Sequence, residues 1–376
     1  MSEGIVQPLL VREGLCHILY ALDIGQSIDL KECDHRITAL KQRARVKHKR
    51  RAPQKYYEYE SPPLRITQEA ASIELGSRRT QPNIDLVIHE FGAVTVLFSV
   101  AVEGPFAELR DLSDRLYDNA ALKDASRRCV EQLLDDIRPA INKPALADVV
   151  EDYAIYEIKA WTAAAPPAEL CGRYATPIAQ VLRSETALLS TQEVDDALSA
   201  RLSFGPEDLA IVDWNAAILF DSDAEDVRTV LELANAELLE MRFLDEQLDE
   251  AMEQAYQALV MQRKRRTWRI VRGASGDLQR IAALQVDSAL LFEGTNNAIK
   301  LLGDQYLARV YRLASQRFHL TEWDTNIIRK LHTLESIYEK MTDRASNLRM
   351  ETLEWIIILL IAVSIALPIV FEVAKP

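Results

Sequence analysis

The sequence predicts an α+β fold, in which a mixed domain of strands and helices is followed by a long antiparallel helical, coiled-coil stalk ending in a single C-terminal transmembrane helix. Three observations predict it. Short apolar, β-branched segments alternate with helical patterns as far as Phe220. No strand pattern follows Asp221, where long helical patterns begin. A charge-free apolar run, Trp355 to Phe371, lies near the end of the chain. We therefore expect domains at 1–222, 223–320 and 321–376.

The first domain carries a buried strand and two hairpins. Gly14 to Asp23 is apolar enough to be a buried strand, and 149–161 alternates like a half-buried one. The clearest hairpin joins 84–90 to 93–102 through a Phe91-Gly92 turn. The second hairpin joins 209–213 to 216–220 around Trp214-Asn215. Helices are expected from Asp29, which can serve as an N-cap, to Ile37, from Pro105 onward, over 121–137 and over 177–200.

The helical part consists of three long patterns. Val227 to Gln262 is an acidic helix, and Ile281 to Leu302 follows with 3-4 spacing. The last helix, opened by a capping box at Thr321, runs without a break from about Trp323 to Phe371. Its 4-3 spacing indicates a coiled-coil seam, although the core face of a helix bundle has the same spacing. The seam positions are Ile327, Leu331, Leu334, Tyr338, Met341, Ala345, Leu348, Thr352 and Trp355.

The apolar run 355–371 predicts the membrane anchor. Its 17 residues would form a helix of roughly 26 Å, and Trp355 would lie at the headgroup layer. The alternative is an apolar helix buried inside an oligomer. Positive charge lies almost wholly before the run, and residues 1–13 resemble no signal or transit peptide. We therefore expect a single-pass protein of the bacterial inner membrane, with the bulk of the chain cytoplasmic.

A basic segment joins the first two long helices. If the three helices are antiparallel neighbours, this segment lies level with Trp355 and can contact lipid headgroups. A nucleic-acid patch and a solvated loop are the alternatives. The residues expected to bind the membrane surface are Arg263, Lys264, Arg265, Arg266, Trp268, Arg269, Arg272 and Trp355.

A second basic run lies in a proline-containing linker, 41–63. Basic residues followed by tyrosines can bind single-stranded RNA through phosphate contacts and stacking. A flexible basic linker without that role is the favoured interpretation. The possible nucleic-acid contacts are Lys41, Arg43, Arg45, Lys47, Lys49, Arg50 and Arg51.

The composition argues against a general nucleic-acid-binding protein, and the sequence contains no known catalytic motif. The net charge is −13, and 191–260 holds 18 acidic and three basic residues. These carboxylates fit a solvated helix face plus loops better than an acid/base pair. The four cysteines form no C-x-x-C pair, which fits a reducing compartment. Cys16-His17 and Cys33-x-His35 match no zinc spacing, so core cysteines and surface histidines are expected. No cofactor, metal or catalytic residue is predicted.

Three helical segments carry a family resemblance. Val230 to Glu250, Leu301 to Asp324 and Lys330 to Val363 resemble the required-for-meiotic-nuclear-division protein family, which is defined by a domain of unknown function. The Leu353-Glu354-Trp355 junction is the most specific mark. The resemblance implies membrane anchoring and, from a mitochondrial relative, a homo-oligomeric tether that supports translation. It supplies no catalytic residues. The absence of a transit peptide favours a bacterial-type member.

The expected function is therefore a non-enzymatic, tail-anchored scaffold. Its stalk would form a homo-oligomer at membrane lipids, and its α+β domain would bind an unknown protein partner. A tether for ribosomes or RNA that supports translation is the alternative. An enzyme of unrecognised class in the α+β domain is the second alternative.

Overall fold

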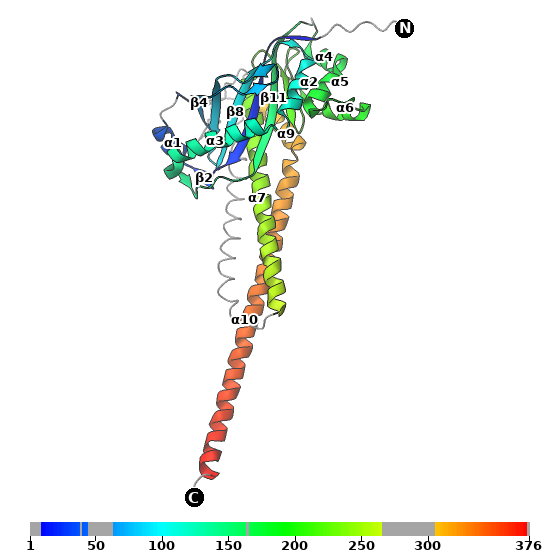
Figure 1. The fold of residues 1–376 in the computed structure, drawn as a ribbon. Coiled ribbons are helices and arrows are strands. Elements are labelled where there is room, and N and C mark those ends of the chain that lie inside the picture. Colours follow the sequence, from blue (N-terminus) through cyan, green and yellow to red (C-terminus); the bar gives the residue numbers. More distant parts are fainter. Residues whose placement is uncertain (1–8, 38–39, 44–62, 163–164, 265–304, 374–376) are drawn as a thin grey trace. The chain divides into compact units, whose positions relative to one another are not determined.

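The computed structural model describes residues 9–37, 40–43, 63–162, 165–264 and 305–373, and it leaves the side chains of 40–43, 258–264, 341–353, 359 and 361–373 undescribed. The chain divides into two compact units (Figure 1). Unit 1 comprises Met1–Phe243 and Ala289–Asp324, and unit 2 comprises Leu244–Ser288 and Thr325–Pro376. The predicted helix over 281–302 lies outside the described residues.

Unit 1 is built on a large mixed sheet. Among the described residues its order is β12-β13-β14-β11-β1-β8-β7-β4-β3, with β9 also paired to β1. All pairs are antiparallel except β11–β14. The α+β class is therefore confirmed. The strands are β1 (Leu10–Asp23), β3 (Leu40–Arg43), β4 (Leu64–Glu69), β7 (Asn83–Ile88), β8 (Ala93–Ala101), β9 (Gly104–Pro105), β11 (Val150–Trp161), β12 (Arg201–Leu202), β13 (Leu209–Val212) and β14 (Ala216–Phe220), with the small pairs β2 (Ser27–Ile28)–β10 (Ile141–Asn142) and β5 (Glu74–Leu75)–β6 (Arg78–Arg79).

The predicted β7–β8 hairpin is confirmed, and its turn requires glycine. Gly92 has φ +112°, in the region that L side chains rarely adopt. A Cβ atom there would lie 1.9 Å from the carbonyl oxygen of Gly25. Ile24 N also donates to Gly92 O at 3.0 Å, so this turn packs directly on the end of β1.

One face of the sheet is covered by short helices. Alternate residues of β1, Cys16, Ile18 and Tyr20, join the main core on this side. Asp29 caps the first helix, as predicted, by accepting from the amides of Lys31 and Glu32. The helices are α1 (Leu30–Arg36), α2 (Glu108–Leu116), α3 (Ala120–Ile137), the 3-10 turn η1 (Arg138–Ala140), α4 (Pro167–Arg173), α5 (Ala175–Arg183) and α6 (Thr191–Ala197).

Two helix predictions in this layer need correction. Pro105 does not open a helix: it pairs with Leu10 as part of β9, and α2 begins at Glu108. The pattern over 177–200 is two helices, because Ser184 adopts a left-handed conformation with φ +50° and ends α5.

The other face of the sheet is covered by α7 (Glu225–Lys264), which packs with α9 (Gln305–Arg317). Every residue from Val230 to Met241 is buried. The acidic side chains there are therefore not a solvated helix face, contrary to the sequence-based expectation. Glu232 and Glu237 expose only 1% and 2% of their surface, because arginine and tyrosine side chains bind them.

Unit 2 contains the remainder of α7 and most of α10 (Leu320–Val373), which lie side by side (Figure 1). Lys330 Nζ joins them by ion pairs to Asp245 and Asp249, at 2.7 and 2.6 Å. The prediction of one unbroken last helix is confirmed. The predicted capping box at Thr321 is not confirmed. The helix α10 begins at Leu320, directly after His319 with φ +56°, so Thr321 lies inside the first turn.

The first four positions of the predicted seam are buried within one copy of the chain. Ile327, Leu331, Leu334 and Tyr338 are between 0% and 8% exposed. Leu248 and Ala255 of α7 are equally buried in the same unit. These four positions therefore act as the core face of a helix pair, which was the alternative interpretation of the spacing. The side chains of the next four positions lie outside the described part.

The prediction of a transmembrane anchor is contradicted. In the part of the chain that the structure describes, no helix combines the length and the apolar character that crossing a bilayer demands. A span needs about 20 apolar residues. The described side chains of the apolar run end at Leu360, six residues after Glu354. The transmembrane helix at 355–371, the tail-anchored description and the inner-membrane location are corrected accordingly.

Candidate functional site

The most distinctive feature of unit 1 is a layer of charged side chains buried between the sheet and α7. The layer is positioned by strand alternation, because residues next to core positions point to the opposite face. Thus His17 lies between Cys16 and Ile18, and Glu157 lies between Tyr156 and Ile158. Charged residues enclosed in this way must be paired to be tolerated.

His17, Ser99 and Glu157 form a hydrogen-bonded chain in this layer. His17 Nε2 lies 3.0 Å from Glu157 Oε2, and His17 Nδ1 lies 3.2 Å from Ser99 Oγ. His17 and Ser99 are direct partners across β1 and β8. His17 was expected to be a surface histidine, but it is only 4% exposed.

Charges around Glu157 hold it ionised. Burial alone would raise its pKa, but the hydrogen bond with His17 and the positive charges of Arg228 and Lys159 outweigh burial and lower the pKa of Glu157. Burial lowers the pKa of His17, and the Arg228 guanidinium acts in the same direction. We therefore assign a neutral imidazole that is hydrogen-bonded to Glu157 through Nε2 and to Ser99 through Nδ1. Glu157 Oε1 also accepts from the amide of Ala224, just before α7.

The ionic layer continues along α7 to the far strands. Arg228 Nη1 lies 3.5 Å from Glu157 Oε2, and Arg228 Nε lies 3.3 Å from Glu232 Oε1. Glu232 Oε2 accepts from Arg65 of β4, whose Nη1 lies 3.2 Å from Asp85 of β7. The chain of charges therefore links β11, α7, β4 and β7.

A serine–histidine–carboxylate chain raises the question of nucleophilic catalysis. Such a mechanism needs the imidazole to accept a proton from the serine. Here Arg228 Nη1 lies 3.1 Å from His17 Nε2, so its positive charge opposes formation of an imidazolium. The Glu157 carboxylate is shared with Arg228 and the start of α7. The arrangement fits a positioning role for α7 better than it fits catalysis.

A second ionic cluster holds α9 against the end of the sheet formed by β12, β13 and β14. Asp213 is fully buried and lies 2.6 Å from Arg183 Nε and 2.7 Å from Arg317 Nε. Asp196 bridges the same two arginines, and they lower its pKa through hydrogen bonds and charge. The cluster joins α5, α6, the β13–β14 turn and α9. In the same unit, Tyr311 of α9 donates to Glu237 of α7 at 2.5 Å.

Some buried polar groups in unit 1 have no hydrogen-bond partner among the described residues. Among them are His89, Thr95 and Asn235. His89 stacks on Phe91 at 5.1 Å, and burial lowers the pKa of His89 to about 3. Within the described chain no group of three His, Cys, Asp or Glu side chains could hold a metal ion. Cys16 and Cys33 lie in the main core.

One cavity of unit 1 bears on the enzyme alternative. It has a volume of about 750 Å³ and is lined by Thr67–Ala71, Pro82 and Asn83. Glu69 is the one ionisable side chain among these lining residues. A catalytic site usually brings several ionisable groups together in its pocket. This cavity does not supply that combination from its described lining.

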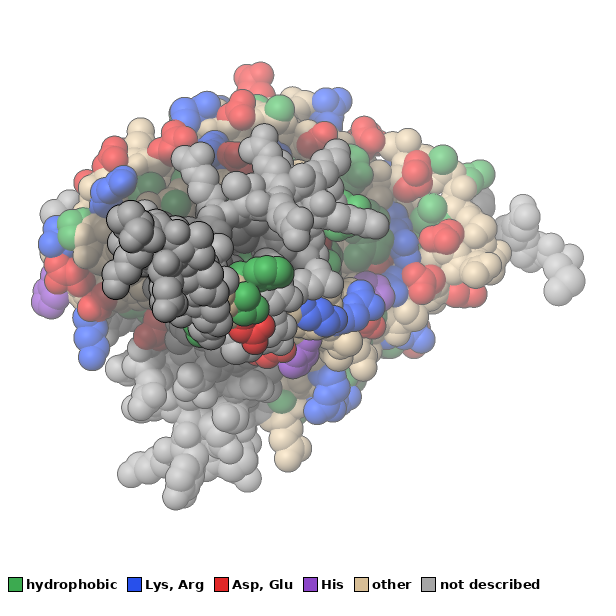
Figure 2. All heavy atoms as spheres, turned by 90° about the horizontal axis from the view of Figure 1, so that it is seen from below, with side chains coloured by type: hydrophobic (Ala, Val, Ile, Leu, Met, Phe, Trp, Pro, Cys, Tyr) green, Lys and Arg blue, Asp and Glu red, His purple; other side chains and the backbone are tan. Residues whose placement is uncertain are grey.

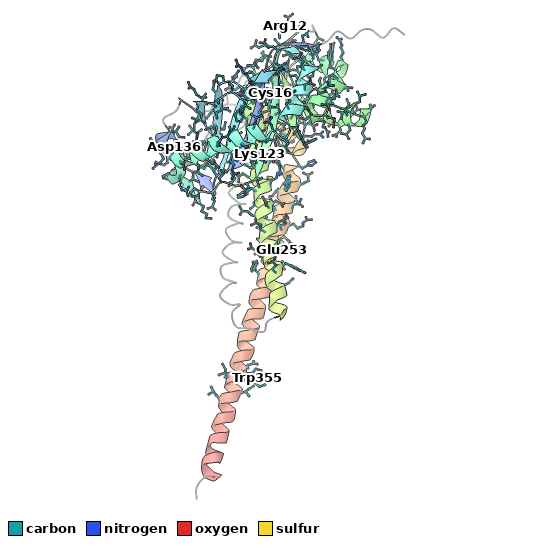
Figure 3. The ribbon with its side chains drawn as sticks, viewed as in Figure 1. Arg12, Cys16, Lys123, Asp136, Glu253 and Trp355 are labelled. Atoms are coloured by element: carbon teal, nitrogen blue, oxygen red, sulfur yellow. The ribbon has the colours of Figure 1, made fainter. Side chains whose placement is uncertain are left out.

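The structure describes few of the site residues that the sequence predicts. Lys41 and Arg43 belong to β3, and Arg263 and Lys264 end α7, but none of these side chains is described. Trp355 is described and is 70% exposed on α10 (Figure 3). The other residues of both basic segments lie outside the described chain, namely Arg45, Lys47, Lys49, Arg50, Arg51, Arg265, Arg266, Trp268, Arg269 and Arg272. Their lipid and RNA roles stay predictions.

Comparison with known families settles the classification of the α+β part. The family model described as "Uncharacterized protein MJ0711, N-terminal domain" matches residues 13–226, more than half of the chain. The chain belongs to this family. "Uncharacterized protein MJ0711" of Methanocaldococcus jannaschii is 23% identical over 241 residues, covering 63% of this chain and 71% of the relative. No solved structure matches.

Membership of the MJ0711 N-terminal domain family confirms the resemblance only at the level of a domain of unknown function. The matched region ends at Asp226, at the start of α7. It therefore contains His17, Ser99 and Glu157 but not Arg228 or Glu232. The sequence patterns above do not predict this ionic layer, although charged residues inside apolar strands are a usable signal.

Proposed function

We propose that this chain is a non-enzymatic scaffold that self-associates through α10 and binds a partner through its α+β unit. The observation that carries the first part is a run of large apolar side chains exposed on α10. Trp355, Ile356, Ile357, Ile358 and Leu360 are 70%, 48%, 55%, 54% and 61% exposed. Contiguous apolar surface of this kind marks an interaction site.

The exposed run favours a second copy of the same chain as the occupant. Successive residues on a helix are about 100° apart, so four consecutive apolar residues surround α10 rather than line one face. A single neighbouring helix of the same copy could cover only part of that surface. Identical helices packed in parallel present the same apolar residues to one another at each level.

A sedimentation experiment on the full chain tests the proposal. The wild-type protein, of 42.5 kDa, should sediment at a multiple of that mass at micromolar concentration. Serine at Ile356, Ile357, Ile358 and Leu360 together should return it to 42.5 kDa. Ile328→Ser, on the same helix and 43% exposed, is the control and should leave the mass unchanged.

Two results would overturn the proposal. A wild-type chain that sediments at the mass of one copy has no self-association to explain. A chain that floats with phospholipid vesicles as single copies has lipid rather than a second copy around this segment.

We also propose that the chain belongs, more narrowly, to the required-for-meiotic-nuclear-division family. The segments that support this placement are Val230 to Glu250, Leu301 to Asp324 and Lys330 to Val363.

A further inference from the structure

The β13–β14 turn and the loop after α5 bring two exposed apolar side chains to one end of unit 1. Asn215 donates to Ser184 Oγ at 2.9 Å, and Asp213 pairs with Arg183. Trp214, 47% exposed, lies between Asp213 and Asn215 in that turn. Leu188 is 90% exposed and follows Ser184 by four residues.

The loop that carries Leu188 is held in place from behind. The side-chain amide of Gln180 donates to the carbonyl of Ala187 at 2.7 Å, and Glu185 accepts from the amide of Ala187 at 2.9 Å. Gln180 is itself buried. Leu188 is therefore presented to solvent by a braced loop.

The segment that carries Leu188 and continues into α6 is acidic. Residues 184–200 hold four carboxylates, Glu185, Glu193, Asp195 and Asp196, and no basic residue. Arg183 and Arg317 neutralise part of this charge, but each also pairs with the buried Asp213. Figure 2 shows acidic and apolar side chains at the right-hand end, where Figure 1 places α6.

We propose that this surface, defined by Leu188 and Trp214 with the four carboxylates of 184–200, binds a basic peptide segment bearing a bulky apolar side chain. The apolar side chain would pack against Leu188 and Trp214, where burial of nonpolar area supplies affinity. The basic side chains would face the carboxylates, which steer association and select partners of positive charge. Charge complementarity is the reason to commit to this class of partner.

This inference deepens the partner-binding half of the proposed function, and it does not depend on self-association. The probe is a fluorescein-labelled eight-residue peptide with four arginines and a central leucine, measured by fluorescence anisotropy with the full chain. Leu188→Ser, and separately Glu185→Gln with Asp195→Lys, should each weaken binding at least tenfold. Replacing the peptide's leucine by serine should weaken it similarly.

The matched control changes charge equally on a distant element. Asp135→Asn with Asp136→Lys alters exposed acids of α3, which lies at the other end of the unit (Figure 3). This variant should bind the peptide as the wild type does. If the control variant weakens peptide binding equally, the overall charge of the protein explains the effect and the proposal is overturned. Binding that ignores the peptide's leucine, or no binding at all, would also overturn it, without bearing on the mass of the assembly.

Discussion

At the scale of single residues, Arg228 is the centre of the buried ionic layer. Its guanidinium faces Glu157, Glu232 and the His17 ring. The gain from such a pair over an apolar core is small, because desolvating charges is costly. Removing one partner is different, since the remaining charges stay buried and uncompensated. The role of Arg228 is therefore best tested by deletion of its charge.

Arg228→Met should lower the free energy of unfolding by about 3 kcal/mol, because Glu157 and part of Glu232 lose their cation in a buried layer. Arg127→Met is the matched control. Arg127 pairs at the surface with Glu131 and Asp148, and such pairs contribute less than about 1 kcal/mol. Urea denaturation followed by circular dichroism measures both. Equal losses would show that the buried layer is not a special source of stability.

Glu151 should make the free energy of unfolding fall as pH rises, whereas an ordinary paired carboxylate makes it rise. Burial raises the pKa of Glu151 to about 7, although Arg242 beside it acts to lower the pKa. Between pH 4.5, near the unfolded value, and pH 7 the folded state therefore binds more protons than the unfolded state. Stability should fall by about 1–3 kcal/mol across this window as pH rises. Glu151→Gln should remove that part of the slope, and an unchanged slope would contradict the assignment.

At the scale of elements, the β7–β8 turn decides whether the central hairpin can close. Gly92→Ala should destabilise the protein by more than about 2 kcal/mol, because a Cβ atom would meet the backbone of Gly25 at a positive φ. Gly172→Ala in α4 has open space around its Cβ and should be neutral or stabilising by up to about 1 kcal/mol. Thermal melts of both variants measure the contrast. Similar melting temperatures would mean that the turn can relax.

Much of the fold could be predicted at this scale. The strands at 14–23, 84–102 and 209–220 were found because β-branched apolar runs and a glycine turn are local signals. The ionic layer was not found, because an acid-rich helix is ordinarily solvated. Glu232 is tolerated as a buried residue because Arg65, 167 residues away in the sequence, pairs with it, and a local pattern does not show that partner. Arg65 between Leu64 and Ile66 was the available hint.

At the scale of the whole molecule, the family boundary and the physical boundary of the fold differ. The matched family region ends at Asp226, but the second face of the sheet is covered only by later residues. Leu19, Ile155 and Leu219 lie on that face and are fully or almost fully buried. The family domain of this chain therefore depends on α7 and α9 to complete its core.

A fragment ending at Asp226 should consequently expose a large apolar face. We expect it to bind the dye 8-anilinonaphthalene-1-sulfonate strongly and to aggregate on size-exclusion chromatography, whereas the full chain should bind less dye. Both samples are compared at equal molar concentration. A fragment that elutes as a folded monomer without dye binding would show that α7 is dispensable for the sheet.

The central claim is that copies of this chain meet through α10, and cysteine cross-linking tests it most directly. A disulfide forms only when two Cα atoms come within about 7 Å. In a Cys129→Ser background, Ile358→Cys should oxidise to a covalent dimer, while Ile328→Cys, about 45 Å away along the helix, should remain a single chain on a non-reducing gel. If Ile358→Cys remains a single chain under the same oxidant, α10 does not bring the copies together.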